Sequence, residues 1–314
     1  MHPRRRPSRG AGATHTRIEC GGMAMVCIDR KRARAAFLAY VDAYDVSNKR
    51  IALKIAHTYR VANLCEQIAK GEGTDEEDVE LAWLCGLLHD SGRFEQLRLW
   101  DTFSDGASAE HAAIGTAVLR GLSASSVPAR VAPAEHPWDA PHPPAPAVGS
   151  GAIESFLQDR AFDDMILASV ECHSLLRVPQ GLDNRTRMLV DIVRDADKID
   201  ILRVNCENSV QTVLGVSQRE FLQSEIGSGA VRAFEERRCL AREERLYPAD
   251  YLVGMALFVF ELVYPASKRI MRDAGQLQRM LVHPFGVQDE FELAQTRETW
   301  SRMAEVLVEY LEEA

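Results

Sequence analysis

The segment LAWLCGLLHDSG, residues 81–92, places an imidazole and a carboxylate at the end of a nearly continuous apolar helix. Burying the adjacent His89 and Asp90 side chains is costly unless they are paired with each other or coordinate a metal ion. Ser91 and Gly92 then form an expected helix stop. The segment therefore predicts either a dyad that merely caps the helix or part of a metal site.

Three further histidines lie in apolar helical segments. His57 has a leucine and a valine four residues to either side, so its imidazole lies on an apolar stripe. His111 opens the segment HAAIGTAVL, in which Gly115 would allow close helix packing, and His173 follows an isoleucine and a valine on its own face. Each histidine alone is more typical of a structural core residue than of a ligand.

A carboxylate occupies a similar position near residue 200. Asp197 lies in MLVDIVRDADKIDILRV, residues 188–204, and is centred on a stripe of valines and isoleucine. A carboxylate there needs a partner. Asp200 shares the same face and could hold a ligand in place from behind. Asp195 points to a different face, so we expect Asp197 to be the buried one.

These residues together provide a mixed nitrogen and oxygen ligand set. Such a set suits iron, manganese or a similar divalent ion, and it contains enough donors for one or two ions. The candidate metal ligands are His57, His89, Asp90, His111, His173 and Asp197.

The order of these residues resembles the HD-domain superfamily, a helical fold of metal-dependent phosphohydrolases, over residues 49–205. The phrases HTYRVA, LLHDSGRFEQ, EHAAIGTAVL and RDADKIDIL are similar to family sequences. His111 and His173 match positions that supply extra ligands in the binuclear branches, which include the HD-GYP cyclic-dinucleotide phosphodiesterases. Ser174 stands where that subgroup has a second histidine, and VPQGL replaces its Gly-Tyr-Pro segment. Cyclic di-GMP specificity is therefore disfavoured.

The resemblance implies a phosphomonoesterase or phosphodiesterase that acts on a nucleotide or other small phosphate ester through a metal-activated hydroxide. One ion would be held by His57, His89, Asp90 and Asp197. Asp90 would bridge to a second ion, completed by His111 and His173. The ligand set also resembles the HD-type diiron oxygenases, and a non-catalytic HD ligand-sensing module is a third alternative.

Cationic side chains near these motifs could bind an anionic substrate. Arg60 follows His57 by about one turn, Arg93 follows the dyad, and Lys198 adjoins Asp197. We predict Asp90, Arg93 and Lys198 as catalytic residues, and Arg60, Arg93 and Lys198 as substrate-binding residues. The alternative for the three cations is a solvated helix face.

Composition limits the classes of partner. Among 314 residues, 37 Lys and Arg oppose 46 Asp and Glu, which disfavours a nucleic-acid coat protein. A small phosphorylated substrate still fits if buried carboxylates first recruit divalent cations. Seven cysteines without paired spacing indicate a reducing compartment. No apolar run reaches the roughly 20 residues that span a bilayer, so we expect a cytoplasmic protein without a membrane partner.

Helical spacing nearly throughout predicts an all-α fold, an HD-domain helical bundle with a C-terminal helical extension. We expect a disordered basic N-terminal extension over 1–30, the HD domain over 31–215 and the helical extension over 216–314. Residues 123–151 hold seven of the thirteen prolines and read as an insertion within the HD domain. The C-terminal extension could cover the pocket or form a homo-oligomer. The expected helices cover 31–45, 49–70, 76–90, 108–121, 161–176, 184–205, 217–241, 249–272 and 289–312.

Overall fold

The computed structural model describes residues 28–133, 147 and 149–313. Within these ranges the chain is all-α, without a strand, which confirms the predicted fold class. A single isolated β-bridge joins Ala109 and Ala129. Most of the predicted N-terminal extension and the centre of the proline-rich insertion, 134–146, lie outside the described residues.

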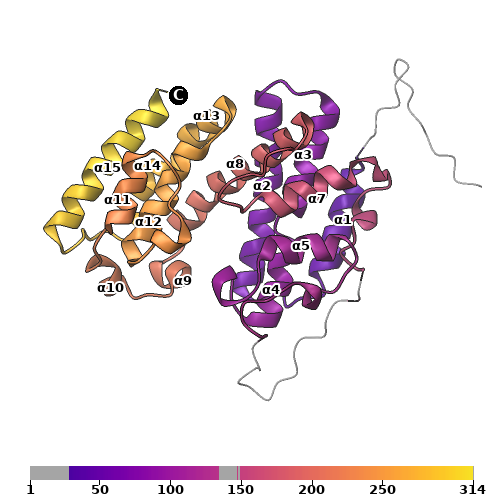
Figure 1. The fold of residues 1–314 in the computed structure, drawn as a ribbon, viewed down its shortest axis with the longest axis horizontal. Coiled ribbons are helices and arrows are strands. Elements are labelled where there is room, and N and C mark those ends of the chain that lie inside the picture. Colours follow the sequence, from indigo (N-terminus) through magenta and orange to yellow (C-terminus); the bar gives the residue numbers. More distant parts are fainter. Residues whose placement is uncertain (1–27, 134–146, 148, 314) are drawn as a thin grey trace, which may run out of the picture.

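The candidate ligands lie in one bundle of helices, drawn from indigo to rose in Figure 1. Within it α2 packs against α3 and α8, α4 packs on α5, α5 on α7, and α7 on α8. These helices are α1 (Arg30–Val41), α2 (Lys49–Gly71), α3 (Glu76–Leu88), α4 (Gly92–Trp100), α5 (His111–Leu119), α6 (Ile153–Phe156), α7 (Asp163–Cys172) and α8 (Asn184–Glu207).

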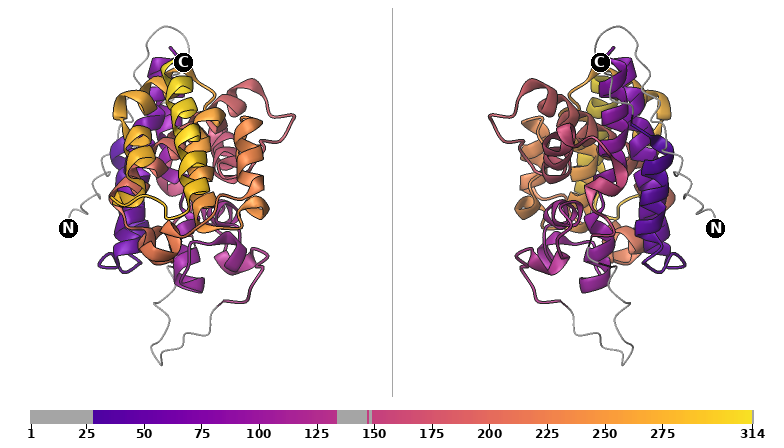
Figure 2. Two further views of the ribbon diagram at one scale, coloured as in Figure 1. Left: turned by 90° about the vertical axis from the view of Figure 1, so that its left-hand side faces the viewer. Right: turned by 90° about the vertical axis from the view of Figure 1, so that its right-hand side faces the viewer.

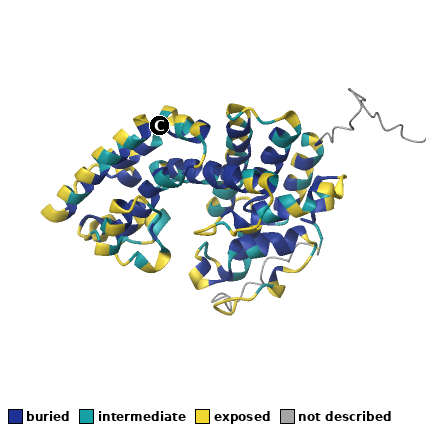
Figure 3. Cartoon of the chain, turned by 45° about the horizontal axis from the view of Figure 1, so that its top comes forward, coloured by how far each residue is buried: buried dark blue, intermediate teal, exposed yellow. Residues whose placement is uncertain are grey.

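The C-terminal helices form a second group beside this bundle, and the end-on views of Figure 2 show one group in front of the other. The long helix α8 joins the groups, because it packs on α2, α3 and α7 and also on α12, α13 and α14. Figure 3 shows it buried along most of its length. The second group contains α9 (Val210–Leu214), α10 (Gln218–Leu222), α11 (Ser228–Glu235), α12 (Pro248–Ala256), α13 (Pro265–Ala274), α14 (Gln276–Val282) and α15 (Ala294–Glu312). The division at 215/216 stays a prediction.

Side-chain caps begin the three helices that position most of the site. Asn48 accepts the Arg50 N–H at the start of α2, and Asp75 accepts the Asp78 N–H at the start of α3. Asp183 accepts two N–H groups at the start of α8. Each cap satisfies donors that the first helical turn leaves free. All three helices begin at the residues that the spacing predicts.

The helix stops close to the predicted position, because α3 ends at Leu88 and a turn over 89–91 follows, but Gly92 itself begins α4. Gly92 does not have a positive φ; its lack of a side chain permits close packing against α5. A Cβ there would lie 2.1 Å from the His111 carbonyl oxygen and 2.4 Å from the Gly115 nitrogen. Phe94 and Trp100, which also lie on α4, are buried.

Two of the expected C-terminal helices are interrupted. The helix expected over 217–241 divides into α10 and α11, and between them the Gly227 N–H donates to Asp250 Oδ1 at 2.7 Å. In place of the helix expected over 249–272, the chain forms α12 and then a 3₁₀ turn over Leu257–Glu261. Helix α13 then begins at Pro265. Proline begins a helix readily but removes a donor inside one. No helix in the described part of the chain is long and apolar enough to cross a bilayer.

The expectation that Asp197 is the buried carboxylate in preference to Asp195 is wrong. The Asp195 side chain is completely buried and accepts the backbone N–H groups of Val263 and Tyr264 just before α13. Burial raises the pKa of Asp195 to about 6. Asp197 is 17% exposed and points to the opposite side of α8, toward the histidines. Asp195 therefore ties α8 to the C-terminal group.

Substitution of Gly92 by alanine should lower the free energy of unfolding by about 3 kcal/mol, because the new Cβ would force α4 and α5 apart. Urea denaturation followed by circular dichroism measures this change. Gly106→Ala is the matched control, since its Cβ would meet only Ser104 Oγ at 3.8 Å. Equal stability of the two variants would contradict the role assigned to Gly92.

Candidate metal centre

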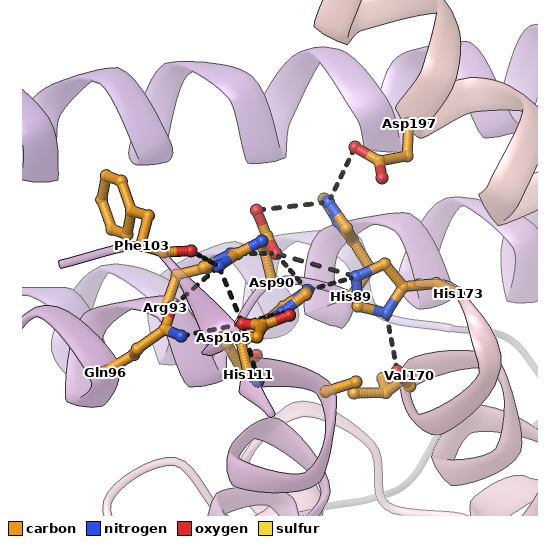
Figure 4. A network of polar contacts seen from close by, with 12 residues as sticks. His89, Asp90, Arg93, Gln96, Phe103, Asp105, His111, Val170, His173 and Asp197 are labelled. Carbon is orange, nitrogen blue, oxygen red and sulfur yellow. Dashed lines mark hydrogen bonds and ion pairs between the residues drawn. The ribbon is translucent and has the colours of Figure 1, made fainter. Parts of the chain in front are cut away.

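Five helices bring the six predicted ligands together, and Figure 4 labels all of them except His57. His57 lies within α2, and His111 is the first residue of α5. The dyad of His89 and Asp90 directly follows α3, and His173 directly follows α7. Asp197, on α8, is the sixth. Apart from Asp197 all are buried, so their polar atoms need partners inside the protein.

The ligand atoms form two groups, each within 4.8 Å: His57, His89 and Asp197, and Asp90, His111 and His173. The carboxylate of Asp90 connects them. Its Oδ2 lies 3.6 Å from Nε2 of both His57 and His89. Its Oδ1 lies 3.7 Å from His111 Nε2 and 3.8 Å from His173 Nε2. Each oxygen of Asp90 therefore faces a different histidine pair.

Backbone carbonyls fix the orientation of two imidazoles. His89 Nδ1 lies 2.7 Å from the Gly86 carbonyl oxygen, and His173 Nδ1 lies 2.7 Å from that of Val170. A carbonyl only accepts, so each Nδ1 carries the proton and donates it. In the neutral ring Nε2 is then an acceptor that faces the centre.

Carboxylates hold the other two imidazoles. His57 Nδ1 lies 2.7 Å from Asp200 Oδ2, which matches the expectation that Asp200 holds a ligand from behind. His111 Nδ1 lies 2.9 Å from Asp105. Both arrangements direct Nε2 toward Asp90, a pattern typical of metal-ligating histidines.

The Nε2 atoms of the four histidines, which point inward, show whether the residues fit a bound cation. Nε2 of His57 and Nε2 of His89 are buried without a hydrogen bond. His111 Nε2 and His173 Nε2 lie 3.0 Å apart, so two acceptor lone pairs face each other. A divalent cation among these atoms would satisfy all four, and nitrogen with carboxylate oxygen suits a borderline ion such as iron or manganese. The residues therefore fit a divalent metal.

Burial keeps three of the imidazoles neutral. It lowers the pKa of His89, and it lowers the pKa of His111 and of His173 to about 4. For His57 burial and Lys54 oppose protonation, but the nearby carboxylates of Asp197 and Asp200 raise its pKa overall. His89, His111 and His173 are thus in the form that binds a metal at neutral pH.

The carboxylates of the centre remain ionised. Burial alone would raise the pKa of Asp90, but Lys54, His89 and Arg93 hold it well below its usual range. Burial opposes ionisation of Asp197 in the same way, and the neighbouring histidines lower its pKa. Ionised carboxylates are the ligands that a divalent cation requires.

The cations of the site differ from the prediction in one position. Arg93 Nε lies 3.4 Å from Asp90 Oδ1, and its Nη1 donates to the Phe103 carbonyl at 2.6 Å. Arg60 is exposed and lines a separate pocket with Asp200, so its position gives no support to substrate binding in this centre.

Lys54, and not the predicted Arg60, is the cation of α2 that contacts the centre. The sequence interpretation did not include it. Its Nζ donates to Asp90 Oδ2 at 2.7 Å. Lys54 precedes His57 by three residues, so helical spacing could have placed both side chains on one face.

Asp105 is a second residue that sequence reasoning missed. Besides His111 it accepts Gln96 Nε2 at 2.8 Å, and Arg93 and Arg242 each approach it at 3.3 Å. Burial opposes its ionisation, but His111 and Arg93 lower its pKa. No apolar stripe or motif surrounds Asp105 in the sequence, so no local pattern indicated it.

A cavity of about 480 Å³ opens onto this centre. The predicted cation Lys198 lines it, and so do residues of the C-terminal group, including Leu240, Arg242 and Phe258. A neighbouring cavity of about 630 Å³ contains none of the six ligands. Of the two roles expected for the extension, covering the pocket agrees with the structure.

The fold and cluster define an all-α protein with histidines and aspartates arranged as a metal site. Residues 55–128 match the family model of the HD domain, so the chain carries an HD domain and the superfamily resemblance is confirmed. The match includes His57, the dyad and His111, whereas His173 and Asp197 lie beyond it. Searches of curated proteins and of solved structures found no match.

The Asp105→Asn variant should bind divalent manganese about tenfold more weakly, because a neutral amide holds the Nδ1–H of His111 less firmly than a carboxylate does. Titration of metal-free protein with manganese measures the affinity. Asp101→Asn removes an exposed carboxylate that pairs with Arg50 and serves as the control. Unchanged affinity in Asp105→Asn would exclude a role for this carboxylate in positioning the ligand.

Proposed function

We propose that this chain is a metal-dependent phosphohydrolase that acts on a small phosphate ester, either a monoester or a diester such as a nucleotide. The HD domain supports membership of a superfamily of metal-dependent hydrolases. The observation that carries the proposal is the Asp90 carboxylate, whose two oxygens face two different histidine pairs inside one cavity.

The residues divide between two cations. His57, His89, Asp90 and Asp197 would hold one, and Asp90 with His111 and His173 would hold a second. When bound, such a cation lowers the pKa of a water molecule and neutralises charge on phosphoryl oxygens.

The protein itself would bind and orient the phosphate. Lys54 and Arg93 approach Asp90 from the two sides of its carboxylate and line the cavity. Both would donate to phosphoryl oxygens as negative charge develops on them. The Phe103 carbonyl holds the guanidinium of Arg93 in place. Lys198 lines the same cavity, where it would bind another part of the substrate.

The charge of the cavity favours hydrolysis over its alternatives. A diiron oxygenase on the same scaffold would use the same histidines, but it would need Lys54 and Arg93 only if its organic substrate were also an anion. A sensing module has no need of a complete set of inward-facing ligand nitrogens. The cations together with the ligands therefore support a phosphate ester as substrate.

Metal analysis of anaerobically purified protein, combined with p-nitrophenyl phosphate and bis-p-nitrophenyl phosphate assays, tests the proposal. We expect bound iron or manganese, and p-nitrophenol release that chelation stops and either metal restores. Oxygen consumption without phosphate ester cleavage would instead indicate the oxygenase. Protein that holds no metal even after reconstitution would indicate the non-catalytic module.

Asp90→Asn should reduce ester hydrolysis by about a hundredfold or more while leaving the fold intact, because the amide fills the same space but cannot serve both cations. Steady-state rates and circular dichroism measure the two effects. Asp195→Asn is the matched control, since this buried carboxylate faces the C-terminal group. Full turnover and metal content in Asp90→Asn would refute the assigned site.

A further inference from the structure

The cavity beside the metal centre is lined by two sets of cations that differ in how they are paired. In the first set, Lys54 and Arg93 contact the carboxylate of Asp90. The second set consists of Arg194 and Lys198 of α8 and Arg245 of the C-terminal group. None of these last three forms a salt bridge with an acid in the part of the chain that the structure describes.

Lys198, like Arg194, is deeply buried, with 7% of its surface exposed. Among the described residues it makes no hydrogen bond and no salt bridge. The acids that influence it are occupied elsewhere: Asp195 accepts N–H groups before α13, and Glu261 is near the Cys239 N–H at 3.3 Å. A buried ammonium without a paired acid is unfavourable unless an anion from outside completes it.

Among the described residues, Arg245 and Arg194 also form no salt bridge, although Glu243 acts electrostatically on Arg245. The Nε of Arg245 is buried without a partner, and its Nη2 donates only to the Leu240 carbonyl at 3.1 Å. The Nη1 of Arg194 donates to carbonyls just after α7, including that of His173 at 3.2 Å. Carbonyls satisfy hydrogen bonds but leave the charge of the guanidinium uncompensated.

The three cations surround one small region. All of them act electrostatically on Cys239, and burial raises the pKa of that thiol to about 11, so it stays neutral. Arg242, a further cation of the wall, approaches Asp105 instead. The region therefore combines three positive charges, which the carboxylates of Glu261 and Asp195 offset in part. All three cations line the cavity that Asp90, His111, His173 and Asp197 also line.

We propose that Arg194, Lys198 and Arg245 form a second anion-binding subsite, which takes a phosphate or carboxylate on the part of the substrate that does not react. The substrate class is then a phosphate ester with an additional anionic group. This class rests on the proposed function, whereas the anion binding itself does not. The extension, through Arg245, thus contributes to specificity as well as covering the cavity.

Binding to the metal-free full-length chain tests the subsite without any turnover. Inorganic pyrophosphate is titrated calorimetrically into chelator-treated wild type, Lys198→Gln and Arg245→Gln, with circular dichroism to establish folding. We expect each variant to bind about tenfold more weakly, because one charged donor is lost. Lys70→Gln, on an exposed part of α2, should bind like wild type. Absent binding in wild type, or equal binding in all four proteins, would overturn the proposal.

Turnover by the metal-loaded wild type provides a measurement that needs no variant. Alkanediol bisphosphates and ω-carboxyalkyl phosphates of increasing chain length are compared with simple alkyl phosphates. We expect kcat/KM to be about tenfold higher for at least one doubly charged series, which also identifies phosphate or carboxylate as the preferred group. Hydrolysis without such a preference would overturn the subsite. Pyrophosphate binding without hydrolysis of any ester would support the subsite and refute the proposed function.

Discussion

The arrangement of the centre depends on one constraint: each of four buried imidazoles is held through Nδ1, so that each Nε2 must face inward. Carbonyls hold His89 and His173, and carboxylates hold the other two rings. Without those outer partners the rings could rotate and satisfy one another. With them, four acceptor nitrogens converge on the carboxylate of Asp90, and a cation is the partner that suits them all.

The sequence was sufficient for the elements and residues that depend on local spacing. The capped starts of α2, α3 and α8 follow from residues within a turn of each helix start. The ligand candidates could be recognised because polar side chains interrupted apolar stripes, as Asp197 does on α8. The structure brings all six candidates into one cluster, since burial of a polar side chain requires partners wherever it occurs.

The features that the sequence does not predict depend on contacts between segments that are distant along the chain. The local sequence predicts the end of α3 near Gly92, but not that Gly92 lets α4 approach α5. Asp195 was placed outside the core, because the N–H groups that it accepts lie about 70 residues later in the chain. Asp105 and Arg245 reach the cavity only through tertiary packing. Helical periodicity describes which side a residue faces, but not what it meets there.

The positions of Asp195 and Asp197 also constrain how α8 can change during evolution. Because they are two residues apart on a helix, their side chains point about 160° apart, one toward the C-terminal group and one toward the histidines. An inserted or deleted residue between them would turn one half of α8 by about 100° relative to the other. Helix α8 can therefore accept substitutions along its length, whereas a change of length at its centre would uncouple the extension from the metal centre.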